Sequence, residues 1–370
     1  MPKRKLSKTD NHKAAKRRRL PAPEQTSKDE VESEDIRNNF VYEPLDHGTD
    51  SIRVFELYPG PKDSIIRCTM RNAKISDEAH ICLSYTWQPS NPQHTIEVNG
   101  RSHSVGENLC QFLRAYRTYM TRKNAADRGS PLWVDALCIN QPDIEERNHQ
   151  VQQMSDIYRN AAKVLVWLGV LDDQVRTFLR RICPDAEKTQ YNDADASQKL
   201  RFQRHARALS TAEYWTRIWV AQELLLPGNG NVFLFEGWAS YELGELYAPL
   251  TAIRVQDSEK PIMLCQEYIS RRQFGILLHD FHFQSMMCSD FSRLLFHFGY
   301  CGCQDSRDRV FALVPLSTVQ GHFNIDYSKN RYALFRHVLE QAMEGACIDG
   351  LLILGAQLIE ALELREPTTE

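Results

Sequence analysis

The 370-residue sequence lacks the glycine-rich phosphate loops of the common nucleotide-dependent enzymes. It contains no GxxxxGK and no GxGxxG segment, so kinase, NTPase and ordinary dehydrogenase functions lose support. It has no apolar run of about 18 residues, the length that spans a bilayer, and its basic amino terminus lacks the apolar stretch of a secretory signal. We therefore expect an intracellular protein with no membrane span.

Regular cysteine and metal-binding patterns are also missing. Ten cysteines are present, but there is no paired CxxC and no HExxH motif. Five metal-capable residues cluster in the second half of the chain, namely His279, His282, Cys288, Cys301 and Cys303. Because they reproduce no known ligand spacing, we expect no metal site. Without an export signal, we expect the cysteines to be reduced thiols.

What the sequence does contain begins with an uneven distribution of charge. The whole chain carries −3, but its first twenty residues hold nine Lys or Arg and one Asp, a local charge of +8 that leaves −11 for the rest. Residues 1–39 have few apolar side chains and a basic half followed by an acidic half, which is typical of a disordered tail. The remaining composition, 42% hydrophobic and 25% charged overall, is that of a globular protein.

Two basic clusters in the tail have the layout of a bipartite nuclear-import signal. They are Lys3, Arg4 and Lys5, followed by Lys16, Arg17, Arg18 and Arg19. The alternative is a solvated tail that touches any polyanion without specificity. Because the body is acidic and shows no zinc-finger, helix-turn-helix or basic-zipper pattern, we expect no specific nucleic-acid binding. The predicted location is nuclear or nucleocytoplasmic.

The most informative stretch covers residues 132–169. Residues 132–137 and 164–168 are short apolar runs of strand length, and apolar residues at helical spacing fill the interval between them. Asp143 is a typical helix N-cap, and Glu146 three positions later completes a capping box. A strand, a helix and a strand of this length predict a right-handed βαβ unit in a parallel sheet.

Other segments extend the α/β pattern. Residues 52–57 and 65–70 predict an antiparallel lead-in, and residues 81–85 predict a strand of the main sheet. Asn99-Gly100 between two strand-like runs predicts a hairpin, because both positions tolerate positive φ. A single helix is expected over residues 212–225, a strand over 232–235, and mostly helix from 241 to 299.

A ligand cleft is expected where the strands end. Open α/β sheets bind ligands at the carboxyl ends of their parallel strands. The chemistry-bearing residues there are Tyr85, Thr86, Trp87, Asp135, Cys138, Asn140 and Gln141. Trp87 could stack on a base or a nicotinamide, with Asn140 and Gln141 as hydrogen-bond partners, and Arg147 could pair with a phosphate. The alternative is structural: the two amides tie down a turn, Trp87 fills the core, and Glu146 only caps its helix.

Nucleophilic catalysis by cysteine is a weaker hypothesis. Cys138 follows Asp135 closely, and His149 on the next helix could serve as its base. Nothing in the sequence indicates that the two side chains meet. A buried, inert thiol is the favoured interpretation.

Several sequence blocks stand in an order that resembles a known family. They are LSYTW at residues 83–87, the LWVDALCINQ to VWLG stretch at 132–169, RIWVAQE at 217–223, and DSRDRVFAL and IDYS at 305–313 and 325–328. Together they are similar to the heterokaryon incompatibility (HET) domain of filamentous fungi, over roughly residues 52–355. The sequence departs from the family at Gln88, where glycine is usual.

The resemblance implies a fold and a chemistry. HET domains are thought to be distant relatives of the Toll/interleukin-1 receptor (TIR) domain, a flavodoxin-like parallel sheet. Enzymatic TIR domains carry a W-x-x-x-E helix whose glutamate is needed to cleave the nicotinamide–ribose bond of NAD. Trp219 and Glu223 match that spacing, which makes Glu223 a candidate catalytic residue and Trp219 a candidate substrate-binding residue. The alternative for Glu223 is a carboxylate paired with an arginine such as Arg217.

We therefore predict an α/β protein: a flavodoxin/TIR-like parallel sheet with crossover helices at residues 81–226, an antiparallel lead-in at 40–80, and a largely helical C-terminal region at 227–370. The resemblance implies non-self recognition and regulated cell death, self-association, and partners in an incompatibility pathway. No bound cofactor is expected, and NAD would be a substrate. The rival functions are an NAD hydrolase, a non-enzymatic death-signalling adaptor that works through protein association and, on the tail alone, a nuclear regulatory protein.

Overall fold

The computed structural model describes residues 39–61, 63–87, 93–122, 127–182, 196–228, 230–246, 250, 276–277, 290–317, 323–343 and 348–364. The chain divides into two units, Met1–Asn39 and Phe40–Glu370, and the elements below belong to the second. The two basic clusters of the tail, Gln88, His279, His282 and Cys288 lie outside the described residues.

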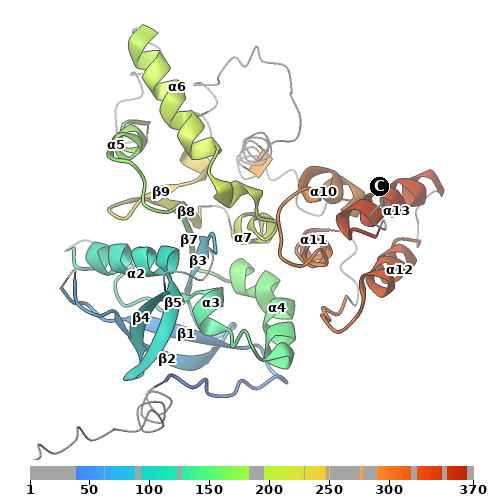
Figure 1. Cartoon of the computed structure of the whole chain (residues 1–370), viewed down its shortest axis with the longest axis horizontal. Coiled ribbons are helices and arrows are strands. Elements are labelled where there is room, and N and C mark those ends of the chain that lie inside the picture. The colour runs from blue at the N-terminus through green and yellow to red at the C-terminus, as the bar shows by residue number, and fades with distance from the viewer. Residues whose placement is uncertain are drawn as a thin grey trace, which may run out of the picture. The chain divides into compact units, whose positions relative to one another are not determined.

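A nine-stranded mixed sheet lies at the centre of the described residues (Figure 1), in the order β5-β4-β2-β1-β6-β3-β7-β8-β9. Its strands are β1 (Ser51–Leu57), β2 (Arg67–Lys74), β3 (Ile81–Tyr85), β4 (Gln93–Val98), β5 (Arg101–Gly106), β6 (Leu132–Trp133), β7 (Lys163–Trp167), β8 (Val232–Phe235) and β9 (Ser240–Glu242). Every residue of β3 is buried. Because successive side chains of a strand point to opposite faces, both faces of the sheet are covered at this point.

The middle of the sheet is parallel. β3 pairs in parallel with β6 and β7, and β7 pairs in parallel with β8. Across the sheet these four strands lie in the order β6-β3-β7-β8. Numbered by their order along the chain, that is second, first, third and fourth. Helix α4 (Ile144–Arg159) connects β6 to β7, so the predicted βαβ unit is confirmed. The carboxyl ends of β3, β6 and β7 therefore share one edge.

The lead-in strands belong to the same sheet. β1 and β2 pair in antiparallel register, as predicted, and β1 also pairs with β6 while β2 pairs with β4. β4 and β5 form the predicted hairpin. Its turn residues Asn99 and Gly100 have φ of 52° and 76°, the positive values that such two-residue turns require.

The strand predicted over residues 132–137 is wrong beyond Trp133. β6 covers only Leu132–Trp133, and α3 (Asp135–Cys138) follows as a single helical turn. The amides of Leu137 and Cys138 donate to the Val134 carbonyl at 2.9 and 2.7 Å. A short apolar run does not distinguish a strand from a buried helical turn, and here the turn brings Asp135 to the edge of the sheet.

The continuous helix predicted over residues 212–225 is also wrong. A 3₁₀ turn, η1 (Glu213–Thr216), and helix α7 (Val220–Leu225) flank Arg217, which forms a β-bridge with Gly302. The Ile218 amide donates to the Gly302 carbonyl at 3.1 Å, and the Gly302 amide donates to the Thr216 carbonyl at 2.6 Å. Pairing with a segment distant in sequence therefore interrupts the helical pattern.

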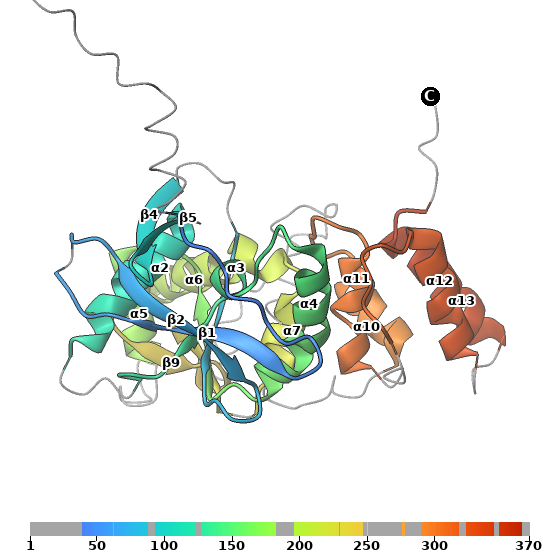
Figure 2. The ribbon, with the colours of Figure 1, turned by 90° about the horizontal axis from the view of Figure 1, so that it is seen from below.

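The remaining helices are α2 (Glu107–Met120), α5 (Asp173–Ile182), α6 (Ala196–Ser210), α10 (Phe291–Phe298), α11 (Asp308–Phe311), α12 (Arg331–Ala342) and α13 (Ile348–Ala361), with 3₁₀ turns η2 (Gly244–Leu246) and η3 (Val314–Leu316). Helices α10 to α13 gather beyond α4 and α7, as Figure 2 shows, and most of residues 241–299, where helix was predicted, lie outside the described residues. β9 falls where helix was predicted, because β8 pairs with it through an antiparallel turn.

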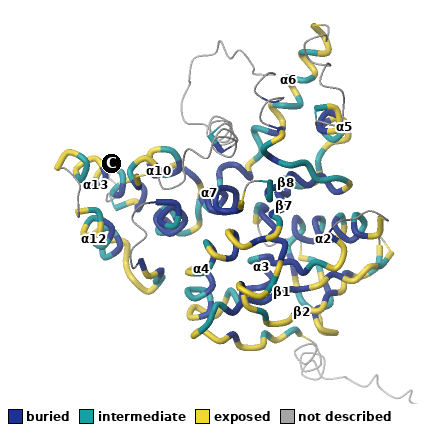
Figure 3. The backbone as a smooth tube through the Cα atoms, turned by 180° about the vertical axis from the view of Figure 1, so that it is seen from behind, coloured by how far each residue is buried: buried dark blue, intermediate teal, exposed yellow. Residues whose placement is uncertain are grey.

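Burial follows this arrangement. The central strands, α2 and α7 are largely buried, whereas α6 and much of α13 are exposed (Figure 3). No helix among the described residues is long and apolar enough to cross a membrane.

Candidate functional site

The loop between β6 and α4 is shaped by a buried ion pair. Asp143 caps α4 as predicted, with its side chain accepting from the amides of Glu145 and Glu146. Glu146 does not complete the capping box. Its carboxylate instead binds the guanidinium of Arg53 on β1, with N···O distances of 2.5 and 2.8 Å. The prediction of a reciprocal capping box is therefore wrong, because a buried cation competes for that carboxylate.

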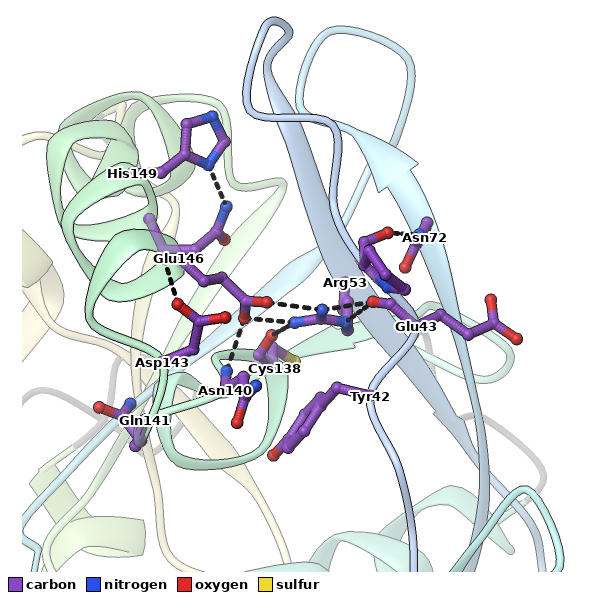
Figure 4. A network of polar contacts seen from close by, with 12 residues as sticks. Tyr42, Glu43, Arg53, Asn72, Cys138, Asn140, Gln141, Asp143, Glu146 and His149 are labelled. Carbon is purple, nitrogen blue, oxygen red and sulfur yellow. Dashed lines mark hydrogen bonds and ion pairs between the residues drawn. The ribbon is translucent and has the colours of Figure 1, made fainter.

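Arg53 ties four segments together, as Figure 4 shows. Its guanidinium donates to the carbonyls of Glu43 and Cys138 and packs over the Tyr42 ring, with 4.8 Å between Cζ and the ring centroid. The Asn140 amide donates to the Glu146 carboxylate at 2.6 Å. Arg53 and Glu146 are 1% and 3% exposed. This network fixes the loop that carries the predicted polar residues.

A cavity of about 440 Å³ lies at the carboxyl edge of β3 and β6, within the size range of small-molecule sites. Six residues predicted from the sequence line it: Thr86, Trp87, Asp135, Gln141, Arg147 and Trp219. The lining also includes Gly302, Cys303, Gln304, Asp305, Asp308 and Tyr327. Tyr85, Asn140 and Glu223 are not among the lining residues, so the predicted set is brought together only in part.

Asp135 and Trp87 form the part of the cavity wall at the sheet edge. The Trp87 indole donates to both carboxylate oxygens of Asp135, at 3.2 and 3.1 Å. Burial raises the pKa of Asp135 to about 6, against the opposing charge of Arg217 and the bond from Trp87. Asp135 is thus a carboxylate that ionises near neutral pH at the rim of a cavity, the behaviour expected of a group tuned for acid–base chemistry.

The two predicted amides serve mainly to hold the loop. Gln141 donates from its side chain to the Asp135 carbonyl at 3.0 Å, while Asn140 contributes its backbone amide to the Glu146 carboxylate. Both contacts agree with the structural alternative drawn from the sequence. Gln141 also lines the cavity. It can therefore contact a ligand as well as hold the turn.

Glu223 is buried behind the cavity wall rather than in it. Its carboxylate binds Arg217 with both oxygens, at 2.9 and 3.0 Å, and accepts from the Ser84 hydroxyl. The Tyr214 hydroxyl lies 2.5 Å from the same serine oxygen. Glu223 is 1% exposed. The contacts are those of the alternative in which this carboxylate pairs with Arg217.

Arg217 connects Glu223 to the cavity. Its side chain lines the cavity, and its guanidinium sits close enough to Asp135 to oppose the rise in the pKa of that residue. Burial lowers the pKa of Arg217, but the charge and hydrogen bonds of Glu223 outweigh it and hold the pKa above its ordinary value. A permanent cation is therefore fixed in the wall, with its planar fork already held by Glu223.

Two lining residues beyond residue 300, Asp308 and Tyr327, were not predicted from the sequence. Asp308 is buried, and the Tyr327 hydroxyl donates to its carboxylate at 2.5 Å. Burial raises the pKa of Asp308 to about 6. The DSRDRVFAL and IDYS blocks contain both residues, so the blocks were the available signal. Their sequence gave no indication that they fold back onto the carboxyl edge of β6.

Tyr85 borders a second, smaller cavity of about 140 Å³ that shares Trp87 with the first. Asn108 at the start of α2 shapes this side. Its amide donates to the Thr86 carbonyl at 2.9 Å and accepts from the Trp167 indole at 2.9 Å. Trp87 is 40% exposed and lines both cavities. It therefore does not fill the core.

Cys138 is a buried thiol, as the favoured interpretation held. It is 0% exposed, burial raises its pKa, and its sulfur accepts from the Val134 amide. The His149 ring is engaged elsewhere, stacked on His47 with 4.7 Å between ring centroids and bonded to Gln153. Among the residues that the structure describes, no group of three or more His, Cys, Asp or Glu is placed to hold a metal ion.

Comparison with known proteins adds the family. Residues 80–223 match the model of a family described as "Heterokaryon incompatibility protein (HET)". These residues, which include β3, the βαβ unit and α7 up to Glu223, form a HET domain, the class of protein that the sequence blocks resembled. The chain thus carries a HET domain over residues 80–223, and the two curated relatives described next are fungal proteins.

Two curated relatives share this region. The chain is 36% identical over 152 residues to "Heterokaryon incompatibility protein 6, OR allele" of Neurospora crassa, covering 38% of this chain and 22% of that protein. It is 29% identical over 156 residues to "Vegetative incompatibility protein HET-E-1" of Podospora anserina, covering 41% of this chain and 9% of that protein. The match thus spans less than a quarter of either relative. No solved structure matches the chain.

Proposed function

We propose that this protein acts in fungal non-self recognition and regulated cell death, and that it does so by cleaving the nicotinamide–ribose bond of NAD. The names of the two relatives support the first part. The observation that carries the second is the 440 Å³ cavity, in which a partly buried carboxylate, Asp135, lies beside the indole of Trp87 at the carboxyl edge of parallel strands.

The strand order supports a flavodoxin/TIR-like core. The parallel strands β6-β3-β7-β8 run as second, first, third and fourth along the chain, which is the start of the flavodoxin-like order 2-1-3-4-5. In that topology ligands bind outside the carboxyl ends of the strands, near the first and third. The two cavities that share Trp87 lie at this edge.

Hydrolysis of the nicotinamide–ribose bond requires one bond to break and one to form. In hydrolysis the bond between the ribose C1′ and the nicotinamide nitrogen breaks, its electron pair leaves with nicotinamide, and a water oxygen attacks C1′. An ionised Asp135 would stabilise the oxocarbenium-like transition state and accept the proton of the water. Its pKa of about 6 leaves it ionised at neutral pH. Trp87 offers the aromatic face for nicotinamide.

Glu223, the candidate from the W-x-x-x-E spacing, has a role in this scheme through Arg217. Because it binds Arg217 with both oxygens, it would position that cation in the cavity wall rather than touch the substrate. A direct role would require Glu223 to exchange Arg217 for a ribose hydroxyl. The two roles differ in what the loss of Glu223 does to folding.

A death-signalling adaptor that works by protein association is the second candidate. Helix α13 presents Ile348, Leu352 and Ile353 to solvent, with exposed fractions of 77%, 67% and 56%. Neighbouring exposed apolar side chains of this kind are typical of association surfaces. Self-association through α13 is compatible with either candidate, so NAD turnover is the property that separates them.

The deciding experiment measures NAD consumption and nicotinamide release by the purified full-length protein, with and without forced oligomerisation. We expect turnover by the wild type, and at least a hundredfold loss in Asp135→Asn with an unchanged circular dichroism spectrum. Asp173→Asn is the matched control, because Asp173 is an exposed residue of α5 remote from the cavity. No consumption by the wild type in either state overturns the hydrolase and leaves the adaptor.

The basic tail adds a proposed location. Lys3 to Lys5 and Lys16 to Arg19 match a bipartite import signal, and we propose that they take the protein to the nucleus. This proposal is independent of the cavity and has its own test below.

A further inference from the structure

The cavity lining carries a cation and an anion that form no ion pair among the described residues, Arg147 inside the matched HET domain and Asp308 beyond it. Arg147 of α4 lines the cavity with its guanidinium over the Tyr327 ring, 4.9 Å from Cζ to the ring centroid. Among the residues that the structure describes, it makes no ion pair or side-chain hydrogen bond, and its Nε is buried without a partner. A buried arginine donor in this state lacks the anion that would satisfy it.

Asp308 is the matching anion. It is buried, lines the same cavity and accepts from the Tyr327 hydroxyl, and no described cation lies within ion-pair distance of it. The nearby Arg307 is held elsewhere, by both oxygens of Asp305 and by the carbonyls of Tyr327 and Lys329. Asp308 accepts from the Tyr327 hydroxyl and from the Trp219 side chain, and because a carboxylate has about four acceptor positions it keeps capacity for a ligand in the cavity that it lines.

Tyr327 joins the two groups. Its ring supports Arg147 and its hydroxyl holds Asp308, so one aromatic side chain contacts both a cation and an acceptor. Arg147 and Asp308 do not form an ion pair with each other. The pair is arranged for a ligand with a negative group at one end and hydroxyl donors at the other.

We propose that Arg147, Tyr327 and Asp308 form a subsite for a ribose phosphate. The guanidinium fork of Arg147 binds the phosphate, and the Asp308 carboxylate accepts hydrogen bonds from the vicinal hydroxyls of the ribose, as acidic residues do in dinucleotide sites. The proposal rests on the proposed function, of which it names the second half of the substrate.

The charge of the cavity argues for this class of ligand over a simple anion. Its lining carries the carboxylates of Asp135, Glu213, Asp305 and Asp308, but only the guanidiniums of Arg147 and Arg217. An anion without hydroxyl donors meets more repulsion than attraction here. A ligand whose hydroxyl groups donate hydrogen bonds to Asp308 is attracted by that carboxylate instead of being repelled by it.

The subsite places the segment around Asp308 and Tyr327 in the ligand site itself. Both residues lie beyond residue 223, where the family match ends. A HET domain cut at that boundary would therefore lose the anion and the aromatic support of the subsite, although it would keep Asp135, Arg147 and Glu223.

The test is equilibrium binding of ADP-ribose and of ribose 5-phosphate to the full chain by calorimetry, since neither ligand carries the bond to be cleaved. We expect ribose 5-phosphate to bind at least tenfold more tightly than inorganic phosphate. Arg147→Gln and Asp308→Asn should each weaken ADP-ribose binding at least tenfold while the circular dichroism spectrum stays unchanged. Tyr327→Phe keeps the ring and removes the hydroxyl, so it should lose less than Asp308→Asn.

Matched controls are Arg336→Gln, at an exposed arginine of α12, and Tyr300→Phe, at an exposed tyrosine; neither should change binding. Equal affinity for inorganic phosphate and ribose 5-phosphate, no binding of either ligand, or variants that bind like wild type would overturn the subsite. NAD cleavage with unchanged KM in Arg147→Gln and Asp308→Asn would overturn it while leaving the hydrolase intact. Ribose phosphate binding that these variants lose, without any NAD cleavage by wild type, would support the subsite and overturn the hydrolase.

Discussion

Glu223 binds Arg217 with both carboxylate oxygens, at 2.9 and 3.0 Å, behind the wall of the cavity that Arg217 lines. The two side chains are 1% and 17% exposed. Because this bidentate pair is buried, removing one partner leaves the other charge uncompensated. The pair therefore affects both the stability of the fold and the geometry of the cavity. The residue singled out by W-x-x-x-E spacing therefore makes a stability prediction as well as an activity prediction.

Glu223→Ala should destabilise the protein by about 3–5 kcal/mol, the usual cost of breaking a buried ion pair from one side. Urea unfolding measures it. Combining Glu223→Leu with Arg217→Met should recover part of the loss, because no buried charge then stands alone. A Glu223→Ala protein with wild-type stability and no NAD turnover would speak against the positioning role and restore direct contact with the substrate.

The Arg53–Glu146 pair should be equally costly to break. Arg53→Met leaves Glu146 buried without its cation and frees the carbonyls of Glu43 and Cys138, so a loss of about 3–5 kcal/mol is expected. Arg67→Met is the control, because Arg67 and Glu97 form an exposed pair that is worth about 1 kcal/mol or less. Similar losses in both variants would mean that the network of Arg53 adds nothing to an ordinary surface pair.

NAD turnover should fall as pH drops through about 6. Burial raises the pKa of Asp135 to about 6 in the folded state, above its unfolded value, so the carboxylate becomes protonated and ceases to stabilise positive charge. Initial rates between pH 5 and 8 measure this. A rate that stays flat down to pH 5 would remove Asp135 from the reaction.

The raised pKa values of Asp135 and Asp308 also make folding stability depend on pH, and stability should fall as pH rises, whereas NAD turnover should rise. A carboxyl group whose pKa is raised by folding binds its proton more tightly in the native state, so its contribution to stability is lost as pH rises from about 4 to about 6. Asp135→Asn and Asp308→Asn should each flatten this decline in urea unfolding series. Asp173→Asn, at an exposed site, should leave the slope unchanged.

Removal of residues 1–20 should abolish nuclear accumulation of a fluorescent fusion in fungal cells, because both basic clusters are lost. Replacement of Lys16 to Arg19 alone by alanine should reduce it, since a bipartite signal needs both clusters. Replacement of the isolated Lys8 is the control. A truncated protein that still enters the nucleus would refute the import signal.

Local patterns predicted much of the fold. Asn99-Gly100 demanded a two-residue turn whatever surrounded it, and Asp143 could cap α4 from its own chemistry. The apolar spacing of residues 151–161 required a helix with one buried face. These features depend on neighbours within one turn, so one sequence is enough to read them.

Competition between distant partners decided what local patterns missed. Glu146 has the position of a capping-box residue, but Arg53 binds it more strongly than a backbone amide can. Residues 212–225 have helical spacing, but the bridge between Arg217 and Gly302 interrupts the helix. In both cases a group far away in sequence offered the stronger interaction.

The sequence by itself determined the α/β class, the βαβ unit, the family and the placement of Trp87, Asp135 and Arg147 at the end of the sheet, because strand direction and chain order already bring those residues to one edge. Only the tertiary structure decided which carboxylate faces ligand space. Asp135 and Asp308 line the cavity, whereas Glu223 is turned to Arg217. The reason is physical: a buried carboxylate is oriented by its strongest cation or donor, and those partners are set by packing between segments that the sequence does not place side by side.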